Sequence, residues 1–407
     1  MSNASKLRAG LTGAVILASL GAGLLVSPAT ATPNPVPSYP SQAEVDAAKN
    51  NVSKKKAVID QLQTVLTTQS QQEQKLQTAA AIKAEAYNQA RDKVVALTAK
   101  VKRLQAQADK AAAKAKAAKT EIGQIAAQMY RNGGTGTTTA LLLDPHNADG
   151  LLYKLGTQER LGSQSGTMYD RAVQQQNLAT SITKQLQTAK AELAGEAQTA
   201  KTAYAQAQAA DNELAAKVDQ NKRLSKKFYG QLAELQNISA DLAKQRADGL
   251  AAEARQNAVK NPPAVAPELY TVGDADTAKV ETALNFARAQ LGERYVLGGM
   301  GPDIWDCSGI TKAAYAAAGV DIGTHSATNQ FNTMAAQRKL IPLNQLQVGD
   351  LMWYSQSSSF NGDKYHVVIY AGNGMMLEAP NPVRVVRIVP IRYGELFPYA
   401  GRPTAGN

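Results

Sequence analysis

The chain's single cysteine, Cys307, stands where a thiol could act as a nucleophile. It lies in the segment Asp306-Cys307-Ser308-Gly309, and the residues that follow, up to Ala318, have the pattern of a helix. Asp306 suits the N-cap of that helix, which places Cys307 in the first turn. Unpaired backbone N–H groups and the helix dipole stabilise a thiolate there. The position therefore predicts a reactive thiol; the alternative is a small buried structural residue.

His366 and Glu378 could complete such a site. Three stretches have the pattern of strands, namely residues 347–354, 366–371 and 375–379. A hairpin turn at Gly372-Asn373-Gly374 would join the last two. If this turn is centred on Gly372, His366 and Glu378 pair across the strands with Cβ atoms about 5 Å apart. A thiol, an imidazole base and a carboxylate that orients the imidazole form a nucleophilic triad. The alternative for Glu378 is a solvated carboxylate at a strand end.

The chain that must position these residues falls into two parts of unlike composition. Residues from 272 onward hold 13 of the 22 aromatic residues, and their eleven basic and eleven acidic residues balance. The net charge of +11 therefore lies in residues 1–271, where only Pro145 interrupts the stretch from Ser41 to Asn261. At about 100–200 residues per domain, this length predicts two or three domains.

Residue counts also exclude several kinds of site. One cysteine excludes an intramolecular disulfide, and three scattered histidines exclude a Cys/His zinc site. We therefore expect no metal and no cofactor. The basic excess suits anionic surfaces such as acidic lipids or wall polymers. Because no DNA- or RNA-binding motif is present, we do not expect nucleic acid to be a partner.

The first 31 residues have the three-part layout of a secretory signal peptide. Lys6 and Arg8 precede an apolar run over 9–26, and Ala29-Thr30-Ala31 is a small-residue cleavage site. The alternative is an uncleaved membrane anchor. No cysteine lies near the site, which excludes a lipoprotein anchor. The pattern predicts a secreted, extracytoplasmic protein that works at the cell wall.

A heptad repeat follows from Val45 to Met129. Apolar residues recur every seven residues over about twelve heptads, and such a seam is typical of a left-handed coiled coil. Four polar residues interrupt it, namely Lys55, Gln69, Glu73 and Lys83. Because many of the remaining seam positions are alanine, we expect a seam soft enough to bend or open.

The heptads end at a glycine-rich stretch, and a second helical pattern runs from about Ser165 to Asn257. Two helices of similar length joined by a structured tip near 131–165 predict an antiparallel hairpin. The alternative is a parallel dimer of extended chains. The tip's apolar segments, 141–143 and 151–155, would form an exposed patch of the kind that marks a partner site, unless the tip packs on itself.

These patterns give a predicted domain organisation. A coiled-coil arm occupies residues 41–258, a semi-rigid proline-rich linker residues 259–271, and a catalytic domain residues 272–402. In that last domain, residues 278–291 have helical periodicity and Gly292 ends the helix.

Several segments of the C-terminal part occur in a fixed order. They are Gly292 to Tyr295 followed by Gly298-Gly299, then Asp306-Cys307-Ser308-Gly309, Val348-Gly349-Asp350-Leu351, and His366-Val367-Val368-Ile369-Tyr370 with Gly372-Asn373-Gly374. Together they resemble the NlpC/P60 family of cell-wall peptidases, over about residues 275–402. The resemblance implies a papain-like α+β fold. It also implies cleavage of peptidoglycan stem peptides, typically between γ-D-glutamate and a diamino acid.

The resemblance also implies roles for single residues. Cys307 matches the nucleophile, His366 the base, and Glu378 the third polar position, where many relatives have histidine and the actinobacterial branch has glutamate. Tyr295 matches an active-site tyrosine. Asp306 and Ser308 match positions that line the pocket for the substrate's free amine.

Two departures from the family pattern stand out. Gly323-Thr324 occupies the place of a frequent Pro-Arg pair, so an expected basic residue is missing, and Val368 replaces a frequent glycine. The first puts the substrate preference in doubt. His325 lies in the same variable segment, where we expect a surface histidine. His146 lies at the predicted tip with no partner that we can name.

The expected fold is thus a long α-helical coiled-coil hairpin plus a papain-like α+β NlpC/P60 domain. An arm of this kind resembles that of secreted division hydrolases, which implies a membrane ABC-type division complex as a partner. The main hypothesis is a peptidoglycan endopeptidase that acts in cell separation. The alternatives are a regulatory scaffold whose arm binds the membrane complex, and thiol chemistry used for amide or acyl transfer. The tether also predicts that the arm inhibits the site.

Overall fold

The computed structural model describes residues 39–131, 148–258, 266–380 and 384–406. The predicted signal peptide, the centre of the predicted tip with His146, and residues 259–265 of the predicted linker lie outside the described residues. Within the described ranges, no helix is long and apolar enough to cross a membrane.

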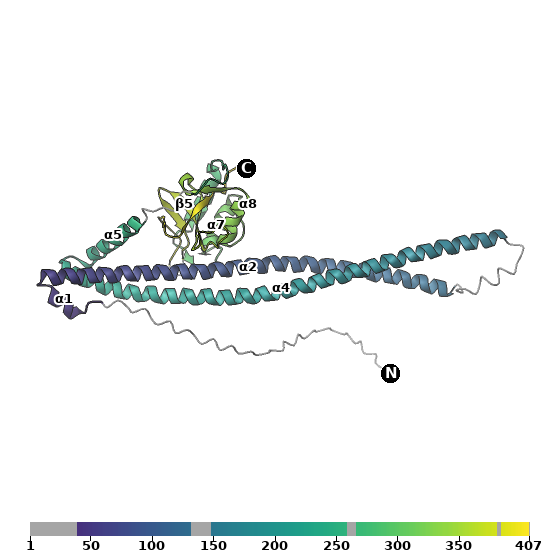
Figure 1. The fold of residues 1–407 in the computed structure, drawn as a ribbon, viewed down its shortest axis with the longest axis horizontal. Coiled ribbons are helices and arrows are strands. Elements are labelled where there is room, and N and C mark those ends of the chain that lie inside the picture. The colour runs from purple at the N-terminus through teal and green to yellow at the C-terminus, as the bar shows by residue number, and fades with distance from the viewer. Residues whose placement is uncertain (1–38, 132–147, 259–265, 381–383, 407) are drawn as a thin grey trace, which may run out of the picture. The chain divides into compact units, whose positions relative to one another are not determined.

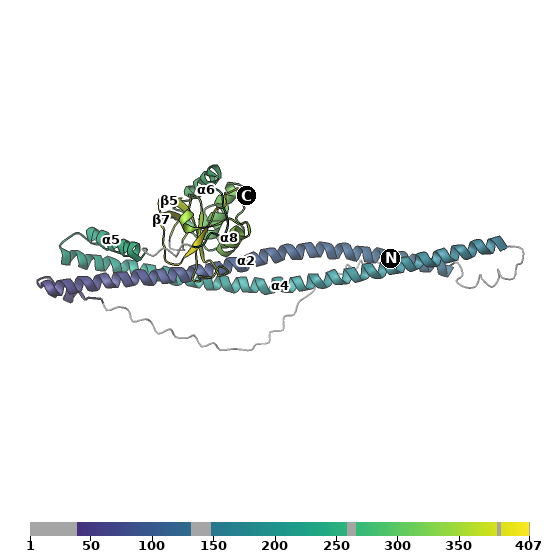
Figure 2. The same ribbon diagram turned by 45° about the horizontal axis from the view of Figure 1, so that its top comes forward.

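Two long helices make up most of the arm. Helix α2 (Val52–Arg131) and helix α4 (Ala148–Gln236) lie side by side in both views of the ribbon (Figures 1 and 2). Leu104 and Ala108 of α2 pack with Leu186 and Ala189 of α4 in one buried cluster. Residues near the start of α2 pack against residues near the end of α4, so the two helices are antiparallel. The predicted hairpin is therefore present.

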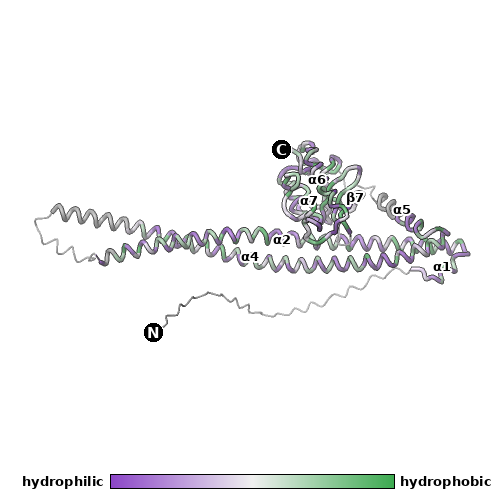
Figure 3. The backbone as a smooth tube through the Cα atoms, turned by 180° about the vertical axis from the view of Figure 1, so that it is seen from behind, coloured by the Kyte–Doolittle hydropathy of each residue, from purple (hydrophilic) through white to green (hydrophobic). Residues whose placement is uncertain are grey.

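The predicted seam supplies most of the buried apolar residues of α2. Its buried members are Leu62, Ala80, Ala90, Leu104, Ala108, Ala111, Ala115 and Ala118. Hydrophilic and hydrophobic residues alternate along both helices (Figure 3), as expected for helices that bury one stripe. Alanine at so many of these positions lets the two backbones approach but buries little apolar surface.

The arm's helices do not have the predicted ends. The heptad seam that starts at Val45 is not one continuous helix, because helix α1 (Gln42–Ala48) ends before α2 begins. The Oδ1 atom of Asn51 accepts a hydrogen bond from the backbone N of Lys54 at 3.0 Å and so caps the start of α2. The second helix begins at Ala148 rather than near Ser165.

The second helix also breaks before its predicted end. Asn237 adopts a left-handed backbone with φ of 52°, which asparagine tolerates better than most residues. Ser239 then caps helix α5 (Ala240–Ala258) by accepting from the backbone N of Leu242 at 3.2 Å. A continuous helical pattern hides both breaks, because they depend on single capping residues.

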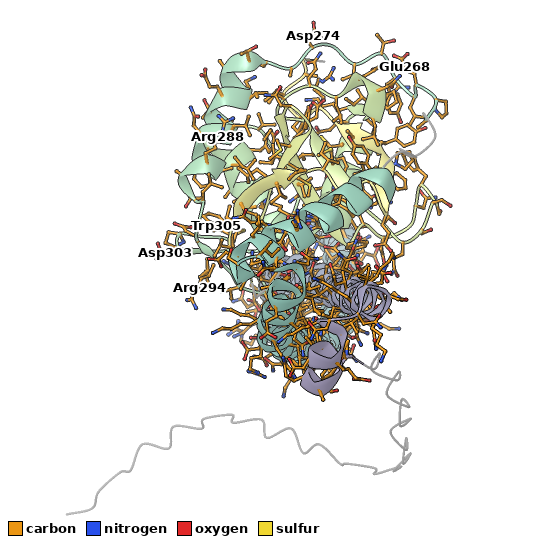
Figure 4. All side chains as sticks on the ribbon, turned by 90° about the vertical axis from the view of Figure 1, so that its left-hand side faces the viewer. Glu268, Asp274, Arg288, Arg294, Asp303 and Trp305 are labelled. Carbon is orange, nitrogen blue, oxygen red and sulfur yellow. The ribbon has the colours of Figure 1, made fainter. Side chains whose placement is uncertain are left out.

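The C-terminal domain begins with three helices and a small parallel sheet. The helices are α6 (Thr277–Ala289), α7 (Cys307–Ala317) and α8 (Ala327–Ala336). The small sheet pairs β1 (Arg294–Tyr295) with β2 (Ile304–Trp305). Its Arg294 is exposed and its Trp305 is buried; both are labelled in Figure 4. This sheet places Tyr295 and the residue before Asp306 side by side.

Six strands form the main sheet. They are β3 (Leu340–Pro342), β4 (Leu351–Tyr354), β5 (His366–Gly372), β6 (Met375–Glu378), β7 (Arg387–Pro390) and β8 (Leu396–Gly401), in the order β3-β8-β4-β5-β6-β7, and every pairing is antiparallel. Val367 and Ile369 of β5 belong to the core cluster that includes Cys307, while Val368 belongs to the cluster on the other face. The sheet and the helices thus form the predicted α+β domain.

Candidate active site

Cys307 is the first residue of α7, as the sequence predicts. The Oδ1 atom of Asp306 accepts from the backbone N of Gly309 at 2.7 Å, which makes Asp306 the N-cap. The Cys307 side chain is buried in the same core cluster as Val367. This cluster brings Cys307 near the part of β5 that follows His366.

His366 and Glu378 are joined by a hydrogen bond between Nε2 and Oε2 of 2.9 Å, and both side chains are buried. The predicted register, however, is wrong. Tyr370 pairs with Met376 and Ile369 with Leu377, and the register shifts after Tyr370. Glu378 is therefore a diagonal neighbour of His366 on the same face rather than its direct partner. The two long side chains span the diagonal.

Two arginines outside the sequence motifs hold the Glu378 carboxylate. Arg387 lies opposite Glu378 in the pairing of β6 with β7, and its Nη2 is 2.7 Å from Oε1. Arg392 donates from Nη2 to Oε2 at 2.8 Å. A predicted pairing of the Glu378 strand with the strand that follows it would have identified Arg387 as the cross-strand partner. Nothing local in the sequence points to Arg392.

The charges around this pair move both pKa values. Burial alone would raise the pKa of Glu378, but the Arg392 charge and the hydrogen bonds from His366 and Arg392 hold it well below its usual value. Burial lowers the pKa of His366, and the hydrogen bond to Glu378 opposes that shift. The resting imidazole is therefore neutral near neutral pH and can accept a proton.

Tyr295, Asp306 and Ser308 lie together beside Cys307. The hydroxyl of Ser308 donates to Asp306 Oδ1 at 3.3 Å, and the backbone N of Gly298 donates to Oδ2 at 3.0 Å. Tyr295 is buried, and burial together with the charges of Asp306 and Cys307 raises its pKa well above the usual value. The predicted binding residues thus form one polar cluster at the N-terminus of α7.

His325 belongs to this cluster, and the expectation of a surface histidine is wrong. Its side chain is buried, and Nε2 lies 2.6 Å from Asp306 Oδ1. The approach depends on Gly309, because a Cβ there would lie 2.9 Å from His325 Nε2 and 2.0 Å from the Gly299 carbonyl oxygen. Although burial opposes it, the His325 contact keeps the pKa of Asp306 below its usual value.

Helix α2 of the arm contacts the same cluster. The side-chain amide of Asn88 donates from Nδ2 to Asp306 Oδ2 at 3.1 Å and to the Ser308 hydroxyl at 3.4 Å. Arg91 donates to the Gly298 carbonyl oxygen at 3.3 Å and to Nδ1 of His325. Both predicted amine-pocket residues, Asp306 and Ser308, are therefore already hydrogen-bonded by the arm.

Glu85 of α2 binds the N-terminus of α8. Its carboxylate accepts from the Ser326 hydroxyl at 2.6 Å and from the backbone N atoms of Ala327 and Thr328 at 2.9 and 3.0 Å. Burial nevertheless raises the pKa of Glu85 to about 7. Glu85 and Asn88 are one helical turn apart and both are buried. They lie outside the heptad seam, on a face that periodicity assigns to solvent, so the sequence carries no signal for them.

The surroundings of Cys307 disfavour the ionised form of its thiol. Burial raises the pKa of Cys307 well above its usual value, and the charges of Asp306 and Glu85 add to the shift. A thiol in this environment is protonated near neutral pH. Of the two charges, that of Glu85 comes from the arm.

The fold and the site define a papain-like α+β domain, with a cysteine at a helix N-terminus and a histidine on the adjacent strand. The sequence model of the NlpC/P60 family matches residues 292–394, and this part of the chain is an NlpC/P60 domain.

The relatives include three curated enzymes. The peptidoglycan endopeptidase RipA of Mycobacterium tuberculosis is 36% identical over 104 residues, 26% of this chain and 20% of RipA. RipB of the same species is 29% identical over 189 residues, 42% of this chain and 72% of RipB. The gamma-D-glutamyl-L-lysine dipeptidyl-peptidase of Bacillus cereus is 30% identical over 129 residues, 31% of this chain and 37% of that enzyme.

The match to a solved structure of RipB from M. tuberculosis covers 31% of this chain and 65% of the RipB chain, with 29% identity and a TM-score of 0.27. The chain spans about a fifth of the length of RipA and just over a third of the B. cereus enzyme.

Proposed function

We propose that the protein is a cysteine peptidase that hydrolyses peptidoglycan stem peptides, between γ-D-glutamate and a diamino acid. The observation that carries this proposal is the site: Cys307 at the start of α7, beside a strand whose His366 is hydrogen-bonded to Glu378 at 2.9 Å. The NlpC/P60 match and the peptidoglycan endopeptidases among the relatives support the substrate class.

The residues divide the reaction as follows. His366 accepts the thiol proton of Cys307 while the sulfur attacks the carbonyl carbon of the scissile amide. The imidazolium then gives this proton to the leaving amine as the C–N bond breaks, which leaves an acyl-enzyme. Water activated by His366 releases the acyl group and restores the thiol. Glu378 orients the imidazole throughout.

Asp306 and Ser308, with Tyr295 beside them, are proposed to bind the free amine of the substrate. A buried carboxylate with a pKa below its usual value stays ionised and so suits an ammonium group. His325, whose Nε2 lies 2.6 Å from Asp306 Oδ1, is an additional member of this pocket. The family pattern gives this histidine no role, because the Pro-Arg pair usual in this segment is missing here.

We also propose that the arm inhibits this site. Asn88 occupies the hydrogen-bonding atoms of Asp306 and Ser308, and Glu85 occupies the donors at the N-terminus of α8. A substrate that uses these groups must displace the arm. Release by a membrane ABC-type division complex, after secretion to the cell wall, would then connect cleavage to cell separation.

The second candidate is a regulatory scaffold at the division site, whose arm binds the membrane complex. The extensive contact of α2 with the C-terminal domain favours a regulatory role for the arm but does not require catalysis. The two candidates differ in turnover: a scaffold predicts that muropeptides remain intact even after the arm is displaced.

The experiment combines catalysis with arm release. Purified muropeptides are digested with a Glu85→Lys variant and with the same variant carrying Cys307→Ala or, as a matched control, Ser358→Ala on an exposed loop. We expect stem-peptide fragments from the first and the control but none from the Cys307→Ala protein. Undiminished cleavage by the Cys307→Ala protein would refute the thiol mechanism. Product masses that show addition of one water across the bond exclude the transfer alternative.

A further inference from the structure

The carboxylate of Glu378 is held more tightly than an orienting residue of a triad requires. Its Oε1 accepts from Arg387 Nε at 3.0 Å, from Arg387 Nη2 at 2.7 Å and from Arg392 Nη1 at 2.8 Å. Its Oε2 accepts from Arg392 Nη2 at 2.8 Å and from His366 Nε2 at 2.9 Å. The side chain is fully buried, so these five contacts replace its hydration.

The fold places each arginine independently. Arg387 is the cross-strand partner of Glu378. Arg392 follows β7, and its guanidinium lies 5.1 Å from the centre of the Tyr354 ring. Tyr354 is buried on β4, where it pairs with His366. Arg392 is thus held between an aromatic face and the carboxylate, close to the imidazole that this carboxylate orients.

The net charge of the cluster bears on His366. One carboxylate and two guanidinium groups leave a charge of one positive unit beside a neutral imidazole, so protonation of His366 would add a second. The ring of Tyr354 on β4 lies 5.6 Å from the imidazole of His366, measured between ring centres, and Tyr365 adjoins His366 in the chain. Cys307 of α7 belongs to the core cluster of the neighbouring Val367. Arg392 and Arg387 both act to lower the pKa of His366, in addition to burial, whereas Glu378 acts to raise it.

We propose that Arg387 and Arg392 are positioning residues that hold Glu378 in place and keep His366 neutral in the resting site. The inference deepens the proposed peptidase function. A neutral imidazole accepts the proton of Cys307 Sγ as sulfur bonds to the carbonyl carbon. The imidazolium so formed is a stronger acid beside two cations, and it returns the proton to the leaving nitrogen as the C–N bond breaks.

The two arginines are not equivalent. Arg392 spans both carboxylate oxygens, including the one that His366 shares, whereas Arg387 contacts only Oε1. Loss of Arg392 therefore frees the oxygen that orients the imidazole. Loss of Arg387 removes a charge but leaves the His366 contact supported. We expect the larger effect from Arg392.

The test follows the titration of His366 in the full-length chain by NMR of selectively labelled histidine, which needs no peptidase activity. Because the chain has only three histidines, His366 is assigned by comparison with a His366→Gln variant. The variants are Arg392→Gln, Arg387→Gln and Arg392→Lys, with Arg288→Gln on the exposed face of α6 as the charge-matched control.

We expect the titration midpoint of His366 to rise by about one pH unit in Arg392→Gln, less in Arg387→Gln and not at all in Arg288→Gln. Arg392→Lys keeps the charge but loses the two-point contact, so it should keep a low midpoint while kcat falls in the Glu85→Lys background. Unchanged midpoints in both glutamine variants, with native folding by circular dichroism, would overturn the inference. Failure to cleave muropeptides would instead contradict the proposed function and leave the titration result standing.

Discussion

Two stretches of the same helix, α2, differ in what they bury. Between Leu104 and Ala118 the buried residues are leucine and alanine of the seam, and the outward-facing side chains are exposed. Between Ala80 and Ala90 the helix also buries Glu85 and Asn88, which point away from the seam. The first stretch is a helix that needs only its partner helix. The second is a docking surface, because a buried carboxylate and a buried amide are stable only where partners satisfy them.

The largest effect should come from reversing the charge at Glu85. Glu85→Lys places a cation against the N-terminus of α8 and removes the three hydrogen bonds that Glu85 accepts from there, each worth about 1–3 kcal/mol when a buried partner is left unsatisfied. We expect the rate of Cys307 alkylation by iodoacetamide to rise at least about tenfold. Glu121→Lys, in the exposed part of α2, is the control. Equal alkylation rates for the two variants would remove the distinction between the stretches.

Destabilising the seam should have an effect of another kind. Leu104 is buried between α2 and α4, so Leu104→Ala should lower the free energy of unfolding of the hairpin by about 2–4 kcal/mol. Thermal unfolding followed by circular dichroism measures this. Asn88→Ala should leave the melting of the hairpin nearly unchanged yet raise the alkylation rate several-fold. If Asn88→Ala lowered the melting temperature as much as Leu104→Ala, Asn88 would be part of the hairpin core instead.

Docking of the second stretch should weaken as pH rises. The pKa of Glu85 is raised from 4.5 to about 7 in the docked arm, mainly by burial. The raised pKa means that docking favours the protonated form of Glu85. The contribution of Glu85 to docking is therefore complete at pH values below the pKa of the undocked group, and it is lost as the pH rises through about 7.

This pH dependence can be separated from ionisation of the thiol. Glu85→Gln cannot ionise, so the ratio of wild-type to Glu85→Gln alkylation rates removes the part of the Cys307 titration that the two proteins share. We expect this ratio to rise between about pH 5 and about pH 8. A ratio that does not vary with pH would show that Glu85 does not titrate on docking.

The smallest effect should come from the rim of the docking surface. Arg384 pairs with Glu73 at 2.9 Å, and the Arg384 side chain is 40% exposed. Exposed pairs contribute about 0–1 kcal/mol, so Arg384→Gln should raise the alkylation rate by no more than about fivefold. The effect should also disappear at high salt, because the solvent screens the pair. A larger change that persists at high salt would place the rim among the main determinants of docking.

Much of the fold follows from patterns that short segments carry. The heptad seam predicts the paired helices α2 and α4, and the alternation at 366–371 predicts β5. Asp306 as an N-cap predicts that Cys307 begins a helix, and the structure confirms it. Each of these rests on interactions between residues a few positions apart, which the sequence displays directly. The helix breaks at Asn51 and Asn237 were not predicted, because one capping residue overrides a long periodic pattern.

Patterns of this kind determined, in this protein, that a long helical hairpin precedes an α+β domain with a thiol at a helix N-terminus and a histidine on a strand. The tertiary structure alone decided the shifted register that sets Glu378 diagonal to His366, the two arginines on Glu378, the burial of His325 against Asp306, and the docking of Glu85 and Asn88. The physical reason is that these contacts join residues distant in the chain. Local periodicity determines which face of an element is apolar, but not which polar side chain from elsewhere will meet the other face.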